Sequence, residues 1–279
     1  VSRKFGLRGW KNWIQNTLVM EATEQLLRHT NIRGLDLIVS SCKDEDESLH
    51  VAYDFTKKLF VGICKRCESY DNGKYNVVDF PFAYRERQLD SVVLPQMALM
   101  TKGLVITEYP VDRRSKGKRV GDYDSSGRID YWCIYKDYSF AIEMKHSYDA
   151  FMTPSTKDAR LIQRWQEMNV NQLSDIRENI REWGESTNGV IRLGLHFVTP
   201  YKEIRESPSG DDYDEFKVNQ KRILSRLCKD VSRKMPSKTT PDFAASWVMN
   251  KRMVIDFDCG EIIPGLMLLA KFFPALKHE

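Results

Sequence analysis

The sequence has little excess of charge of either sign and no long hydrophobic run. Its 43 lysine and arginine residues nearly balance 39 aspartate and glutamate residues, so the net charge is +4. That excess does not by itself predict a nucleic-acid partner. The longest apolar segment, 262–273, contains Pro264 and Lys271, and it is shorter than the ~20 residues of a membrane-spanning helix. We therefore predict no contact with a membrane.

Cysteine is also sparse. Six cysteines are scattered over 279 residues, which predicts free thiols in a reducing compartment rather than a disulfide framework. The first basic residues lead into no apolar segment, so we expect no signal peptide and a cytoplasmic location. Cys64 and Cys67 form one CxxC. A structural zinc site needs two further ligands, so a pair of packed thiols on a helix is the simpler interpretation.

The first part of the chain predicts a helical lobe. Apolar residues recur there at the three-and-four spacing of amphipathic helices, and the turn sequence Asp71-Asn72-Gly73 ends the helical pattern. We place a domain boundary near Asp79, which divides the chain into an N-terminal helical lobe, 1–79, and a second domain with a C-terminal extension, 80–279. The elements predicted in the lobe are helices over 10–28 and 49–67 and a strand or extended turn over 34–40.

The second domain predicts a layered α/β fold. Strands rich in β-branched and aromatic residues alternate with helical patterns, and two of the strands are so close in sequence that they indicate a hairpin. This order is typical of a mixed central sheet flanked by helices. The predicted elements are a helix over 84–100 interrupted by Pro95, strands over 104–111, 127–135, 138–147 and 190–199, a long helix over 155–185, a helix over 216–229 and a strand within 245–257.

Two carboxylates and a lysine occupy neighbouring positions of the predicted hairpin. Glu143 and Lys145 lie two apart on one strand and therefore project from the same face. If the turn centres on residues 136–137, Asp130 faces Glu143, with Cβ atoms ~4.5–5.5 Å apart. Carboxylates this close repel unless a cation lies between them, and Mg²⁺ takes oxygen ligands of this kind. Such a set favours phosphodiester hydrolysis, in which Lys145 orients the attacking water.

These residues resemble the PD-(D/E)XK nuclease superfamily. Asp130 is followed thirteen positions later by Glu143-Met144-Lys145, and Ile129 stands where the family motif has proline. The resemblance covers about residues 80–200. It implies a restriction-endonuclease-like core, a Mg²⁺ or Mn²⁺ site and a nuclease activity, for which DNA is the preferred substrate. It also implies that Glu86 assists the metal from the preceding helix and that Gln172 reaches the site from the following one.

A basic loop precedes the aspartate strand and suits contact with phosphates. Its cationic residues are Arg113, Arg114, Lys116, Lys118 and Arg119. A solvated loop is the plainer alternative, because charged loops are common. A second acid-rich match, Glu215-Phe216-Lys217, lies in no predicted strand. We interpret His146, His196 and the Trp165–Trp183 stripe as structural.

Other functions stay open at this stage. The charges of the hairpin could form only a surface cluster of small energetic value. The protein could then be a catalytically silent nucleic-acid-binding or scaffold protein with a nuclease-like fold. An RNA-directed nuclease is the second alternative, because metal-assisted hydrolysis does not require the 2′-hydroxyl. The lobe over 1–79 could select the substrate, form a homodimer or bind a protein partner.

Overall fold

The computed structural model divides the chain into two compact units, Val1–Arg33 and Gly34–Glu279. All the residues that the structure describes belong to the second unit. The helix predicted over 10–28 and the predicted boundary near Asp79 lie outside the described residues. These residues are 35–40, 46–70, 86–114, 123–150, 157–174, 176, 187–203, 225–226, 228–249, 255–257 and 261–276.

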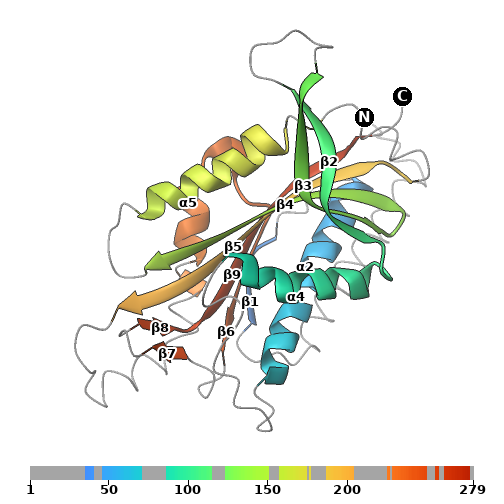
Figure 1. Ribbon diagram of the computed structural model, residues 1–279. Helices are drawn as coiled ribbons and strands as arrows, with labels where there is room; N and C mark the ends of the chain where they lie inside the picture. Colours follow the sequence, from blue (N-terminus) through green and yellow to red (C-terminus); the bar gives the residue numbers. More distant parts are fainter. Residues whose placement is uncertain are drawn as a thin grey trace, which may run out of the picture. The chain divides into compact units, whose positions relative to one another are not determined.

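The second unit is an α/β fold built around a mixed sheet (Figure 1). Seven strands lie in the order β1-β6-β9-β5-β4-β3-β2, and β7 and β8 pair beside the end of β5. Among the described strands, only β4 and β5 are parallel neighbours. The strands are β1 (Leu35–Ser40), β2 (Val105–Arg114), β3 (Tyr123–Tyr135), β4 (Tyr138–Ala150), β5 (Val190–Glu203), β6 (Phe243–Val248), β7 (Ile255–Phe257), β8 (Glu261–Ile263) and β9 (Gly265–Leu276).

Helices cover both faces of the sheet. Phe140 of β4 stacks on Phe55 of α2, with ring centroids 4.7 Å apart. The next residue, Ala141, points to the opposite face and belongs to a cluster with Trp165 of α5. The helices are α2 (Glu47–Tyr70), α4 (Glu86–Met100), α5 (Lys157–Gln166), the π-helix η1 (Glu167–Gln172) and the 3-10 turn η2 (Ser237–Thr239).

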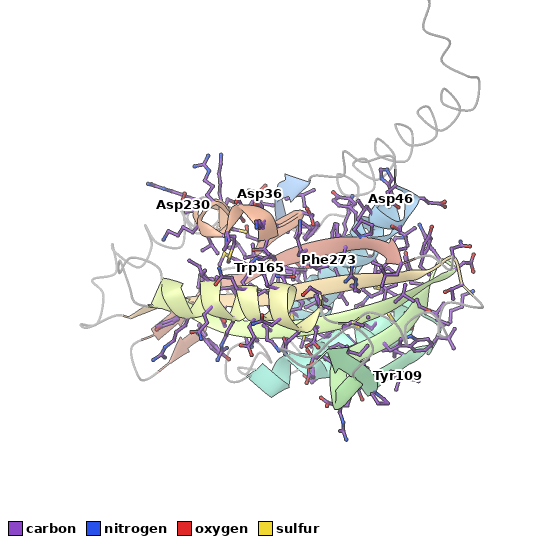
Figure 2. All side chains as sticks on the ribbon, turned by 90° about the horizontal axis from the view of Figure 1, so that it is seen from above. Asp36, Asp46, Tyr109, Trp165, Asp230 and Phe273 are labelled. Atoms are coloured by element: carbon purple, nitrogen blue, oxygen red, sulfur yellow. The ribbon has the colours of Figure 1, made fainter. Side chains whose placement is uncertain are left out.

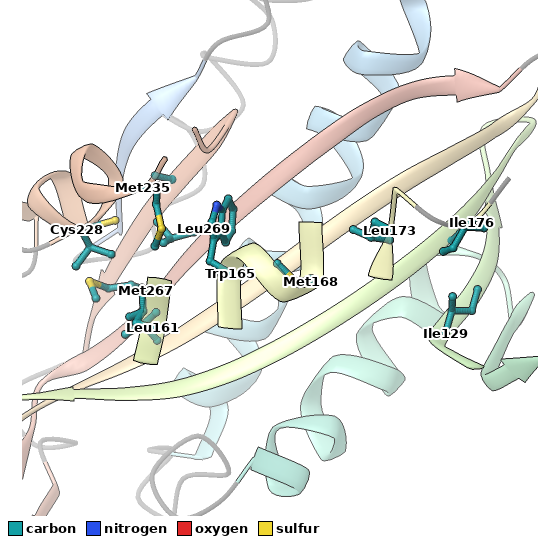
Figure 3. Packing of buried hydrophobic residues seen from close by; sticks show 14 of the residues in the cluster. Ile129, Leu161, Trp165, Met168, Leu173, Ile176, Cys228, Met235, Met267 and Leu269 are labelled. Atoms are coloured by element: carbon teal, nitrogen blue, oxygen red, sulfur yellow. The ribbon is translucent and has the colours of Figure 1, made fainter. Parts of the chain in front are cut away.

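The apolar core on the α5 face joins the long helix to the middle of the sheet. Trp165 is fully buried, as its predicted core role requires, and it lies between α5 and the strands (Figure 2). Leu161, Met168, Met267 and Leu269 belong to the same buried cluster, and Figure 3 shows Leu161 beside Met267 and Trp165 beside Leu269 of β9. The apolar segment 262–273 therefore contributes most of a central strand. No helix in the described part of the chain is long and apolar enough to cross a membrane.

The predicted hairpin is confirmed, including its register. Tyr135 pairs with Tyr138, so the turn centres on Lys136 and Asp137. Both residues have positive φ, 48° and 60°, as a type I′ hairpin turn requires. The strand predicted over 190–199 is β5, which is buried between β4 and β9.

The structure differs from the sequence prediction in the length of one helix and in the placement of two further elements. The long helix ends early, because it passes into the π-helix η1 and Ile176 already lies in an extended bridge. Arg192 of β5 also donates to the carbonyl of Leu173 at 3.2 Å, which holds this end of the helix to the sheet. In addition, β1 pairs with β6 and α2 contacts β5, β6 and β9. These two elements, assigned from sequence to a separate lobe, are part of the compact unit that holds the sheet.

Candidate functional site

Strands β3 and β4 separate partway along the hairpin. Their ladder ends at the pair Tyr131 and Ile142, one residue short of Asp130 and Glu143. Beyond that pair, β3 continues alongside β2 and β4 continues alongside β5. Figure 1 shows the two strands diverging. We call this point the fork, and it contains the residues on which the sequence prediction depended.

Asp130 lies in the fork and caps the end of the ladder. Its Oδ2 accepts a hydrogen bond of 2.6 Å from the backbone N–H of Met144. Because the ladder has ended, no carbonyl of β3 pairs with this N–H, and the carboxylate takes the place of that acceptor. Asp130 remains partly exposed to the pocket described below, so the same side chain can serve both the backbone and a ligand.

Glu143 and Lys145 lie side by side on β4. Lys145 Nζ is 3.8 Å from Glu143 Oε2, and the side chains are 25% and 2% exposed. This separation is an ion pair but is too long for a hydrogen bond. A carboxylate in so buried a place costs free energy unless charges or hydrogen bonds compensate it. Buried ionisable groups with a charged neighbour are typical of functional sites.

A pocket of about 580 Å³ opens at the fork. It is bounded by α4, β2, the hairpin, α5 and the start of η1, and it brings four carboxylates together with a lysine, an arginine and a histidine. Of the predicted site residues, Asp130 and Lys145 line the pocket, whereas Glu143 and Gln172 do not. The lining residues are Asp90, Leu94, Thr107, Glu108, Asp130, Tyr131, Met144, Lys145, His146, Arg164 and Glu167.

On the α4 side of the pocket, Tyr131 donates a hydrogen bond of 2.5 Å to Asp90 Oδ1. Burial raises the pKa of Tyr131 far above its ordinary value, and the charge of Asp90 raises it further, so the phenol stays protonated. Asp90 lies one turn after Glu86, the metal ligand predicted on this helix. Glu86 begins α4, but its side chain lies outside the described residues.

On the α5 side, Arg164 donates to the carbonyl of His146 at 2.6 Å. His146 Nε2 shares a hydrogen bond of 2.8 Å with Thr199, and His196 Nε2 shares one of 2.8 Å with Ser147. Burial lowers the pKa of His146 to about 4 and that of His196 to about 3, with smaller contributions from nearby positive charges including Arg164. Both imidazoles are therefore neutral near pH 7.

Glu108 has an unusual backbone conformation beside Asp130. Its φ is +51°, which is uncommon for a residue other than glycine. The β2–β3 ladder skips Glu108 and Asp130, which stand opposite each other between the pairs Thr107–Tyr131 and Tyr109–Ile129. Strained backbone of this kind tends to occur at functional sites. Sequence reasoning missed Glu108, because no residue pattern signals this conformation.

Polar residues of η1 also lie close to β4, an element that η1 contacts. Asn169 is 1% exposed, and its Oδ1 has no hydrogen-bond partner among the described residues. The same holds for Oε1 of Gln172. Asn169 was missed from sequence, although an amide among the apolar positions Trp165, Met168 and Leu173 was the available signal.

The remaining predicted site residues are only partly described. Arg113 and Arg114 end β2, but their side chains lie outside the described residues. Lys116, Lys118, Arg119 and the second motif, 215–217, lie outside them altogether. Within the described ranges, no cluster of three or more His, Cys, Asp or Glu side chains could hold a metal ion. The structure therefore describes the side chains of Asp130 and Glu143 but not that of Glu86, the third predicted metal ligand.

The CxxC pair is buried in α2. Cys64 and Cys67 are free thiols with no exposed surface. Burial raises the pKa of Cys67 to about 12 and raises that of Cys64 strongly. Zinc binds thiolates, so these protonated thiols fit the packed pair that the sequence favoured.

Together, these elements define an α/β protein with a mixed seven-strand sheet flanked by helices. No protein-family model and no curated protein matches the chain significantly. A solved structure titled "Crystal structure of SSO0001" is similar at 13% sequence identity over 82% of this chain and 89% of that chain, with a TM-score of 0.19. A score this low supports no inference about fold or function.

Proposed function

We propose that the protein is a metal-dependent nuclease with a restriction-endonuclease-like core that hydrolyses phosphodiester bonds in DNA. The observation that carries this proposal is the fork. There, the separation of β3 from β4 opens a pocket that Asp130 and Lys145 line, and the buried Glu143 lies 3.8 Å from Lys145. A carboxylate pair beside a lysine at the end of a strand ladder suits metal-assisted phosphoryl chemistry.

The donor set at the fork fits a hard divalent cation. Asp130 and Glu143 contribute carboxylate oxygens, the ligands that Mg²⁺ and Mn²⁺ prefer. The 3.8 Å between Lys145 and Glu143 leaves the buried carboxylate without a hydrogen bond from that ammonium. We propose that Asp130 and Glu143 hold Mg²⁺ or Mn²⁺ and that Glu86 assists. When bound, the cation polarises the phosphoryl group and lowers the pKa of a bound water.

The other residues of the pocket act on the substrate. The ammonium of Lys145, which is 25% exposed, orients the attacking water and stabilises negative charge that develops on the phosphoryl oxygens. Arg164 is held in place by the carbonyl of His146, and its guanidinium matches the geometry of a phosphate. Gln172, at the end of η1, does not line the pocket but remains a proposed catalytic residue. The basic loop over 113–119 would contact the DNA backbone.

A catalytically silent nucleic-acid-binding or scaffold protein is the second candidate. Its support is that Asp130 already satisfies the backbone N–H of Met144 and that Glu143 already has an ion-pair partner. Carboxylates with such partners can serve the fold alone. The two candidates differ in cation binding, because only the nuclease requires Mg²⁺ or Mn²⁺. An RNA-directed nuclease differs from both in its substrate.

The decisive experiment compares cleavage of supercoiled plasmid, linear duplex, single-stranded DNA and RNA with Mg²⁺, Mn²⁺ or EDTA. The variant is Lys145→Met, and the control is Lys271→Met. Like Lys145, Lys271 forms an ion pair with a carboxylate, that of Asp242 at 3.0 Å, and its side chain is 19% exposed. It does not line the pocket. We expect metal-dependent cleavage of DNA by the wild type and the control, and at least 100-fold less by Lys145→Met.

Two results would contradict the proposal. One is equal cleavage by Lys145→Met and Lys271→Met, which would remove the lysine from the mechanism. The other is a wild-type protein that cleaves no substrate and gives no heat on titration with Mn²⁺. Cleavage of RNA in preference to DNA would support the site but correct the substrate.

A further inference from the structure

Asn169 is a buried amide whose orientation is determined by its partner. Its Nδ2 donates a hydrogen bond of 3.0 Å to the carbonyl of Trp165, so Oδ1 is the other, unpartnered atom. The residue is 1% exposed, and no described residue donates to Oδ1. A buried oxygen without a donor destabilises the folded protein, because it has lost its hydrogen bonds to water. A bound ligand that supplies the missing interaction is one explanation of such an atom, and the neighbourhood of Asn169 favours it.

Asn169 Oδ1 lies directly against the backbone of Gly194 in β5. A Cβ at Gly194 would lie 2.4 Å from Asn169 Oδ1 and 3.0 Å from Met168 Cε, so only glycine permits this approach of η1. Gly194 is the register partner of Glu143 in the parallel β4–β5 pair. Paired residues of neighbouring strands are about 5 Å apart.

The side chain of Glu143 projects toward the same helix. Glu143 lies two residues after Ala141 and therefore on the same face of β4. Ala141 belongs to the core cluster that includes Trp165 and Met168. The amide oxygen of Asn169 and the side chain of Glu143 therefore lie on the same face of the sheet, the face that η1 covers.

The π-helical turn is what presents Asn169 to the sheet. Leu173 N–H bonds to the carbonyl of Met168 at 2.9 Å, which is the five-residue spacing of a π-helix. Such turns are rare and occur often at functional sites. Here the turn places Asn169 on the inner side, whereas Val170 is 50% exposed.

We propose that Asn169 Oδ1 is an oxygen ligand of the divalent cation that binds at Glu143. A buried carboxylate and a buried amide oxygen lie there on either side of one register pair, and both are ligands of hard cations. Lys145 Nζ is a nearby cationic group, and at 3.8 Å from Glu143 it does not donate a hydrogen bond to that carboxylate. This inference rests on the proposed function, because it concerns the same cation.

Calorimetric titration with Mn²⁺, without nucleic acid, tests the inference. Asn169→Leu keeps the approximate volume but removes the oxygen, so we expect at least tenfold weaker Mn²⁺ binding. Asn169→Asp substitutes a charged oxygen ligand, so we expect tighter binding and a larger Mn²⁺-induced rise in Tm than in the wild type. Gly194→Ala would push the amide away, and we expect it to weaken binding. A merely structural amide would lower Tm without these changes in affinity.

Ser246→Ala is the matched control. Its hydroxyl is also fully buried and lacks a hydrogen-bond partner among the described residues, but it lies on β6, which β9 separates from the β4–β5 pair that holds Glu143 and Gly194. We expect unchanged Mn²⁺ affinity in this variant. If Asn169→Leu does not fold, Asn169→Asp alone decides, because tighter binding supports the ligand role and unchanged binding overturns it.

The two proposals fail in different ways. Wild-type affinity in both Asn169 variants, with affinity lost in Glu143→Gln, would overturn the role of Asn169 and leave the nuclease proposal supported. A wild-type protein that binds no Mn²⁺ would overturn the cation itself, and with it both proposals.

Discussion

The Asp130 carboxylate accepts a 2.6 Å hydrogen bond from the Met144 backbone N–H at the point where β3 leaves β4. A second aspartate does the same elsewhere in the sheet. Asp242 Oδ2 accepts a hydrogen bond of 2.8 Å from the N–H of Phe272. Of these two aspartates, only Asp130 lines the pocket at the fork. The two aspartates therefore allow a structural role to be separated from a chemical one.

Asp130→Asn is expected to abolish cation binding while the protein stays folded. The amide oxygen can still accept the N–H of Met144, but the negative charge that attracts Mg²⁺ or Mn²⁺ is lost. We expect cleavage to fall by about 100-fold or more. Asp242→Asn is expected to retain cleavage. Equal activity of the two variants, measured on one DNA substrate, would contradict the role of Asp130.

Glu143→Gln is expected to stabilise the metal-free protein. The substitution removes a buried charge and keeps the side-chain shape, while Lys145, at 25% exposure, can be hydrated. We expect the free energy of unfolding in EDTA to rise by about 1 kcal/mol, as measured by urea denaturation. Cleavage should be lost in the same variant. A decrease in stability would instead favour the scaffold function.

Stability is expected to fall as the pH falls from about 6.5 toward 4. The pKa of His146 is lowered to about 4 and that of His196 to about 3 by burial, whereas both are near 6.5 in the unfolded chain. Between the folded and the unfolded pKa values, the unfolded chain binds more protons than the folded protein does. Lowering the pH through this range therefore favours unfolding. Each histidine contributes at most about 1.4 kcal/mol per pH unit.

Urea denaturation at a series of pH values measures this dependence. His146→Gln is expected to reduce the slope between pH 6 and pH 4.5, because one of the two titrating groups is gone. A slope that is the same in the wild type and the variant would show that other groups control the acid response. Stability above pH 7 should not depend on this titration.

Tyr131→Phe is expected to affect both stability and cleavage. The variant loses the hydrogen bond to Asp90, which lines the pocket. Tyr135→Phe is the matched control, because Tyr135 donates to Asp54 at 2.8 Å, and neither lines the pocket. Each variant should lose about 1.5–3 kcal/mol of stability, since the acceptor is charged. Only Tyr131→Phe should lower cleavage, and equal kinetics in both would contradict a role for Asp90.

Local patterns were sufficient for the hairpin. Alternation across β4 placed Glu143 and Lys145 on one face, and the short link between the strands determined the turn and therefore the register that ends near Asp130. Helix α4 and strand β5 were also predictable, because their apolar periodicity is strong. The π-helix η1 could not be predicted, because its residues continue the helical pattern of α5 and no local pattern indicates the wider turn.

The sequence by itself determined the elements around the site and which residues share a strand face, because these depend on backbone geometry within a few residues. The tertiary structure alone decided the fork, the approach of Asn169 to Gly194 and the gathering of Asp90, Glu108 and Arg164 around the pocket. It also decided that β9, near the end of the chain, lies between β5 and β6. Such pairings depend on the burial of distant segments against one another, and local periodicity carries no information on which partner a buried face will meet.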